Sequence, residues 1–106
     1  MVKLIALYRR PEDEAAFLEH YERVHTPLAM AVPGLVRLVA NRVTADAFGG
    51  EPPYFLIAEM HFPDRATFDA ALRSPENRAL SKDLMGFAKG IVTVLFADED
   101  TTEVAV

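Results

Sequence analysis

Three histidines are the residues of this chain best suited to acid–base chemistry: His20, His25 and His61. An imidazole titrates near neutral pH, where a general acid or base is most effective. His25 follows Tyr21 by one helical turn and precedes Thr26-Pro27, so we expect it at the edge of a buried helix face. Two interpretations stay open: a catalytic imidazole beside a pocket, or a histidine that closes the helix, where positive charge suits the helix dipole.

The other two histidines have different surroundings in the sequence. His20 lies among charged neighbours and is expected to be a solvated surface residue. His61 is two residues from Glu59 on an expected strand, so the two side chains point the same way, about 7 Å apart. That pair would either orient an imidazole for catalysis or form a polar pair in a dimer interface. Tyr8 and Tyr54 are further candidates for hydrogen-bond donors to a developing oxyanion.

Other kinds of chemistry have little support in the sequence. The absence of cysteine excludes disulfides, thiolate nucleophiles and thiolate metal sites. His20 and His25 are five residues apart rather than three or four, so we expect no metal site. Gly49-Gly50 has no helix N-terminus behind it and predicts no phosphate-binding loop. We therefore expect no bound cofactor.

The composition limits the classes of partner that we expect. The net charge of −5, from 11 basic and 16 acidic residues, argues against a nucleic-acid partner. No apolar run approaches the roughly 18 residues of a membrane span, so we expect no membrane partner and a cytoplasmic location. The 106 residues predict one domain, 1–106, and the 51% of apolar residues suggest a second buried surface, hence a homodimer.

Hydrophobic periodicity and turn residues divide the chain into strands and helices. We expect strands at Val2–Tyr8, Leu35–Thr44, Tyr54–Phe62 and Ile91–Ala97, a long loop at Ala45–Pro53, and later helices opening at Asp64 and at Ser74-Pro75. The first helix is expected to start at Pro11, and its regular part is expected to end near His25, because Pro27 disfavours helical geometry before it. A short helical turn could resume through Ala29-Met30-Ala31 before Pro33-Gly34 stops it.

Within these elements the apolar spacing predicts what is buried. The buried face of the first helix is expected to comprise Phe17, Leu18, Tyr21, Val24 and Leu28. Met30, Met60 and Met85 are interpreted as core residues. The acidic segment after residue 97 is expected either to fray or to pair through Thr101–Val106 with another chain.

The order of elements is β-α-β-β-α-β, which predicts an α+β ferredoxin-like fold: a four-stranded antiparallel sheet with helices on one face. The Tyr54–Phe62 strand carries large apolar side chains on both faces. Since both faces of such a sheet need covering, the pattern again predicts dimerisation, through the face without helices.

Five segments together form a recognisable pattern: Lys3 to Pro11, Phe17 to Tyr21, His25-Thr26-Pro27-Leu28, Pro33-Gly34-Leu35 and Asn41-Arg42-Val43. This pattern resembles the EthD family of the dimeric α/β-barrel superfamily. The resemblance implies a homodimer whose sheets close into an α/β barrel, with a small pocket in each protomer. In isomerase-type relatives a histidine at the end of the first helix is placed at the active site, and His25 matches it. The histidine that follows a helix-opening proline in cyclase-type relatives is absent from Ser74-Pro75-Glu76-Asn77.

The resemblance also implies a substrate class. Family members are associated with catabolism of ether, aromatic or lactone compounds and are often labelled oxidoreductases. We therefore expect a cofactor-free enzyme that acts on a small lactone, phenolic or ketone-like molecule by proton transfer at His25, with Tyr8, Tyr54, Glu59 and His61 as substrate-binding residues. The alternatives are an EthD-type oxidoreductase, which would need a redox-active substrate or a borrowed cofactor, and a non-catalytic homodimer that binds a small hydrophobic or aromatic metabolite.

Overall fold

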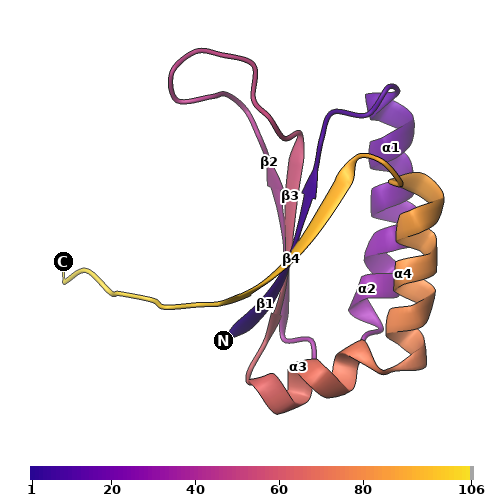
Figure 1. Ribbon diagram of the computed structural model, residues 1–106, viewed down its shortest axis with the longest axis vertical. Helices are drawn as coiled ribbons and strands as arrows, with labels where there is room; N and C mark the ends of the chain where they lie inside the picture. The colour runs from indigo at the N-terminus through magenta and orange to yellow at the C-terminus, as the bar shows by residue number, and fades with distance from the viewer. Residues whose placement is uncertain (106) are drawn as a thin grey trace.

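The computed structural model describes residues 1–105 and forms one layer of strands and one layer of helices (Figure 1). In chain order the elements are β1 (Val2–Tyr8), α1 (Glu14–His20), the π-helical turn η1 (Tyr21–His25), α2 (Thr26–Met30), β2 (Arg37–Arg42), β3 (Leu56–Phe62), α3 (Arg65–Leu72), α4 (Pro75–Phe87) and β4 (Val92–Asp98). The four predicted strands are all present, each within two residues of its expected ends.

The four strands form one antiparallel sheet in the order β2-β3-β1-β4. This order, with α1 and α4 packed on the same face, confirms the α+β ferredoxin-like fold (Figure 1). β1 occupies the centre and pairs with β3 from Val2↔Phe62 to Tyr8↔Leu56. Its even-numbered residues therefore face the helices, and its odd-numbered residues face the side of the sheet that carries no helix, here called the open face.

Alternation along the strands separates core from open face. On β3 the side chains of Leu56, Ala58, Met60 and Phe62 are buried beneath the helices. The core comprises two clusters, one around Phe62 and Phe68 and the other around Tyr8 and Phe17. The space between these two clusters is where the cavity described below lies.

Capping residues explain where the helices begin. Asp64 accepts a hydrogen bond from the Thr67 amide at 2.8 Å, and Ser74 accepts one from the Asn77 amide at 3.1 Å. These two residues are the N-caps of α3 and α4, so both helices open where the sequence predicts. The start of the first helix was predicted wrongly at Pro11. Asp13 is the cap, because its carboxylate accepts from the Ala16 amide at 3.0 Å, and the helix begins at Glu14.

The predicted end of the first helix near His25 is also wrong. α1, η1 and α2 follow one another without a break to Met30, and Pro27 lies inside them. The chain accommodates the proline by widening: the Thr26 amide donates to the Tyr21 carbonyl five residues back. A wide turn relieves the clash between a proline ring and the preceding carbonyls, and single π-turns of this kind often occur at functional sites.

The structure also shows where the methionines, the C-terminal segment and the turn before β2 lie. Of the methionines interpreted as core, only Met60 is buried, whereas Met30 and Met85 are 68% and 50% exposed. After β4 the Glu99 amide donates to the Met1 carbonyl at 2.9 Å, and residues 100–105 then extend away from the body without forming a strand (Figure 1). Of the expected pairing segment Thr101–Val106, Val106 lies outside the described residues. Between α2 and β2, Gly34 has a φ of +83°, and a Cβ there would clash with the Thr67 side chain, so this turn requires glycine. No helix in the described part of the chain combines the length and apolar character needed to cross a membrane.

Candidate functional site

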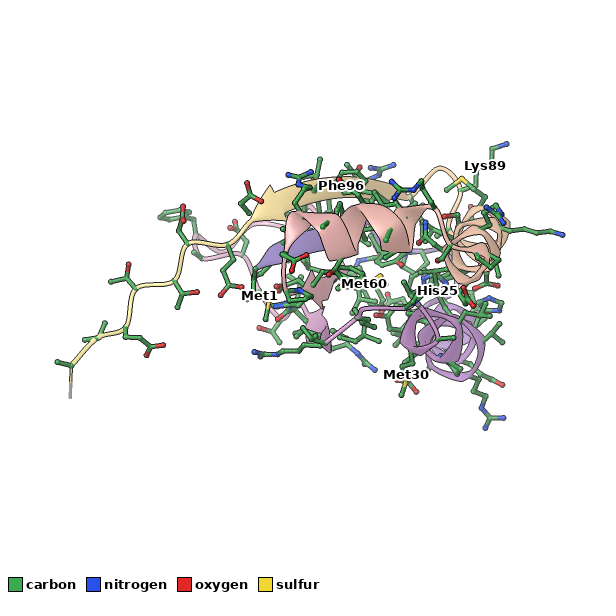
Figure 2. All side chains as sticks on the ribbon, turned by 90° about the horizontal axis from the view of Figure 1, so that it is seen from below. Met1, His25, Met30, Met60, Lys89 and Phe96 are labelled. Atoms are coloured by element: carbon green, nitrogen blue, oxygen red, sulfur yellow. The ribbon has the colours of Figure 1, made fainter. Side chains whose placement is uncertain are left out.

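The π-helical turn determines where His25 points. The sequence predicted Val24 on the buried face, but Val24 is 41% exposed and His25 only 7% exposed. The widened turn shifts the register of the helix, so that His25 lies on the same inner face as Tyr21, one turn further along. Its ring lies 5.8 Å from the Tyr21 ring and 4.9 Å from the Phe87 ring, centre to centre. Figure 2 shows His25 on the side of its helix that faces α4.

A carboxylate on α4 holds the His25 ring. Asp83 Oδ2 lies 2.9 Å from His25 Nδ1, and Asp83 Oδ1 lies 2.8 Å from His20 Nε2. A carboxylate only accepts, so Nδ1–H of His25 donates to it and the neutral ring carries its lone pair on Nε2. His20, expected as a solvated residue, is in fact the outer partner of this carboxylate, with 35% of its side chain exposed.

Sequence reasoning missed Asp83, although a signal for it is present. Leu80, Leu84 and Phe87 recur at helical spacing along α4 and form an apolar stripe, and Asp83 falls on the same stripe. An acid among core positions needs a polar partner, because burial of an unpaired carboxylate is costly. Only 16% of its side chain is exposed, and the two histidines supply the partners.

His25 borders a cavity of about 320 Å³ between the sheet and the helices. This volume is at the lower end of small-molecule sites. Tyr8 and Tyr21 also line it, and aliphatic side chains from both core clusters complete most of the wall. The site therefore combines one titratable imidazole with an enclosure that suits a small, mostly apolar ligand.

The cavity changes the ionisation of the groups that line it. Burial lowers the pKa of His25 below its ordinary 6.5, against the opposing effect of the Asp83 carboxylate. Burial raises the pKa of Tyr8 and of Tyr21, so both hydroxyls keep their protons. At neutral pH the lining thus presents an uncharged base and two uncharged hydrogen-bond donors.

Only some of the other residues predicted for the site lie at the cavity. Tyr8 lines the cavity, whereas Tyr54 lies in the loop before β3 and is not part of the lining. Glu59 and His61 occupy odd-numbered positions of β3, so within one protomer they lie on the open face, behind the sheet from His25. The structure places a single histidine of the three against the cavity.

On the open face a separate polar cluster surrounds His61. His61 Nε2 lies 3.1 Å from Glu59 Oε1, and Lys3 Nζ lies 2.9 Å from the same oxygen. Asn41 Nδ2 donates to Glu59 at 3.0 Å, and Lys3 also lies 3.3 Å from Glu99. The Lys3 hydrogen bond is the main reason that the pKa of Glu59 is lowered. Within residues 1–105 no set of three or more acidic, histidine or cysteine side chains is arranged to hold a metal ion.

Comparison with known proteins places this chain in a family. The model of the EthD domain matches residues 9–91, and the chain belongs to the EthD family. An EthD family protein from Bacillus halodurans C-125 is 40% identical and superposes with a TM-score of 0.90, covering 94% of this chain and 99% of that one. An uncharacterized 11.0 kDa protein from the thcB-thcC intergenic region of Rhodococcus erythropolis is 37% identical over 95% of this chain and 97% of its own length.

Less similar structures share the fold alone. SnoaB, a cofactor-independent oxygenase from Streptomyces nogalater, is 17% identical with a TM-score of 0.69, covering 95% of this chain and 94% of that one. A dimeric ferredoxin-like protein of unknown function from Thermobifida fusca is 18% identical with a TM-score of 0.65, covering 91% and 88%.

Proposed function

We propose that this EthD family protein is a cofactor-free enzyme that transfers a proton on a small ketone-, lactone- or phenol-like molecule, with His25 as general acid and base. The observation that carries the proposal is the buried pair of His25 and Asp83. The carboxylate holds Nδ1 at 2.9 Å while the ring borders a mostly apolar cavity. An imidazole oriented in this way is typical of groups that take and return protons.

The proposed reaction is a proton transfer at carbon next to a carbonyl. Nε2 of His25 removes the proton, the electron pair moves to the carbonyl oxygen, and an enolate and an imidazolium form. Asp83 stabilises the imidazolium without taking its proton, and the Tyr8 hydroxyl is the candidate donor to the enolate oxygen. Return of the proton to another atom of the enolate would complete an isomerisation.

Hydrogen exchange tests this step without knowledge of the natural substrate. The protein is incubated in D2O with acetophenone, cyclohexanone or δ-valerolactone, and loss of the α-proton signal is followed by NMR. We expect exchange above the buffer rate for at least one compound and its loss in His25→Asn. Exchange that is absent for all three, or unchanged in His25→Asn, would contradict the proposal.

We also propose that the protein is a homodimer that buries the open face of the sheet. Ile5 and Leu95 lie opposite each other on that face, and Leu95 is 50% exposed in the protomer. Covering these side chains would add apolar burial to a small domain. We expect Leu95→Asp to give a monomer in analytical ultracentrifugation, whereas Val24→Asp on the exposed side of η1 leaves the mass of a dimer.

Non-catalytic binding of a small hydrophobic molecule is the second candidate. The observation in its favour is that hydrocarbon groups form most of the cavity lining. A binding protein would hold the same compounds without exchanging their α-protons. The exchange experiment, performed at ligand concentrations that saturate the cavity, therefore separates the two functions.

A further inference from the structure

The two walls of the cavity differ in chemistry. The sheet contributes hydrocarbon side chains such as Ala58 and Met60, with Tyr8 its one hydroxyl. The helices contribute most of the polar groups, which are His25, Tyr21, Thr26, Asn77 and Ser81. A ligand with an oxygen at one edge would satisfy both walls when its oxygen points toward the helices and its hydrocarbon part lies on the sheet.

The residues described around the cavity include no permanently charged side chain. Within the described chain, no lysine, arginine, aspartate or glutamate side chain lines it. His25 is the basic group there, and its neutral form is favoured by burial. A carboxylate or ammonium that entered would lose its water without meeting a permanent opposite charge, which is strongly unfavourable.

The mouth of the cavity is equally uncharged. Among the lining residues, Met85 on α4 and Val94 and Phe96 on β4 are 50%, 38% and 55% exposed. Ser81, one turn before Met85, is also exposed. The other lining residues are buried or half-buried, and none of them is exposed, so the cavity opens to solvent between α4 and β4, across a rim of three apolar side chains and one hydroxyl.

We propose that this cavity selects uncharged ligands: ketones, lactones or phenols that carry no carboxylate and no amine, and that enter between α4 and β4. The inference rests on the proposed function in placing the ligand beside His25. It adds the exclusion of acids and amines, the route of entry and the orientation of the ligand between the two walls.

Ring-matched compounds test the exclusion of charge. Binding of acetophenone is compared with that of benzoate, and cyclohexanone with cyclohexylamine, at pH 7 by the shift of the Met60 methyl signal. We expect each ketone to bind at least about tenfold more tightly than its charged partner. Benzoate or cyclohexylamine binding as tightly as the matched ketone would overturn the proposal, as would failure of both ketones to move the signal.

A charge placed at the mouth tests the route of entry. Met85→Lys sets an ammonium on the rim, so we expect the affinity for benzoate relative to that for acetophenone to rise about threefold or more. Met30→Lys is the matched control, because Met30 is 68% exposed and points away from the body (Figure 2). An equal affinity for benzoate relative to acetophenone in the two variants would contradict entry between α4 and β4.

The exchange experiment and the binding experiment test different claims, so either claim can fail without the other. If His25-dependent exchange occurs but benzoate binds as tightly as acetophenone, the selection of neutral ligands is wrong and the proposed enzyme remains. If the ketones bind selectively but exchange does not depend on His25, the charge selection holds and the proposed enzyme is wrong.

Discussion

A histidine–carboxylate pair lies on each side of the sheet, one between η1 and α4 and the other on β3. On the helix face His25 lies 2.9 Å from Asp83, and on the open face His61 lies 3.1 Å from Glu59. Both imidazoles are buried within the protomer, at 7% and 6% exposure. Distance and burial alone therefore do not distinguish a catalytic pair from a structural one.

What surrounds each pair does distinguish them. Lys3 and Asn41 also bond to Glu59, so that carboxylate already has several partners, and His61 does not line the cavity beside His25. Asp83 bonds to two imidazoles, and the inner one borders empty space large enough for a ligand. The comparison teaches that a histidine–carboxylate pair becomes a candidate site when the second ring nitrogen has access to a ligand.

The largest expected effect follows from replacing each histidine in turn. His25→Asn should lower the rate of α-proton exchange at least about 100-fold, since it removes the general base. His61→Asn should change that rate less than about threefold, because His61 lies behind the sheet. Exchange rates in D2O check both variants. An equal loss of exchange rate in the two variants would contradict the claim that His25, and not His61, takes part in the reaction.

Asp83→Asn tests the carboxylate beside the cavity. The change keeps the size of the side chain but removes the charge that stabilises the imidazolium, so exchange should fall on the order of tenfold to 100-fold. Without the carboxylate the pKa of His25 should fall further, because Asp83 raises it in the native protein. A histidine NMR titration measures this direction. A rise of the pKa would show that Asp83 does not act on His25.

Replacement of His20 is expected to change the exchange rate less, because His20 acts only through its hydrogen bond to Asp83. His20→Leu removes one hydrogen bond to the carboxylate and should slow exchange about two- to fivefold, as expected for a partly exposed pair. His20→Gln can place an amide N–H near the former Nε2 and should restore most of the rate. Similar rates for the two variants would exclude a positioning role for this hydrogen bond.

The dependence of stability on pH provides a second contrast. Burial lowers the pKa of His25 below 6.5, so the unfolded chain binds a proton more readily than the folded one. The contribution of His25 to the free energy of unfolding is therefore complete above pH 6.5 and is lost as the pH falls below it. Denaturant titrations from pH 7 to 5 should show this loss in the native protein and a weaker slope in His25→Asn.

Glu59 should act in a different pH range. Its pKa is lowered, mainly by the hydrogen bond from Lys3, so its contribution is present above its ordinary 4.5 and is lost only at lower pH. Lys3→Met should raise the pKa of Glu59 toward 4.5 and change α-proton exchange by less than about twofold. Carboxyl carbon NMR checks the first expectation. A large loss of exchange would mean that the open face contributes to the reaction.

The sequence predicted the fold well because the relevant signals are local. Asp64, Ser74 and the alternation along β3 each mark an element within a few residues. The histidine at the cavity, His25, was also predicted, from its place one turn after Tyr21. The π-helical turn η1 was not predicted. Pro27 normally ends a helix, and only a widened turn keeps it inside one.

The partners of His25 depend on contacts between distant segments. Asp83 is 58 residues away in the sequence, and only the packing of α4 against η1 brings it to the histidine. The position of Glu59 and His61 behind the sheet follows from the face on which the helices pack. Alternation separates the two faces of a strand, but the identity of the face that adjoins His25 comes from tertiary structure.

The most direct test of this account is a nitrogen NMR titration of His25 with and without acetophenone. We expect His25 to titrate below 6.5, to carry its neutral-form proton on Nδ1, and to show a shift of Nε2 when the ketone binds. A His25 that titrates at or above 6.5, or whose Nε2 signal is unaffected by the ketone, would contradict the claim that this imidazole is the base of the cavity.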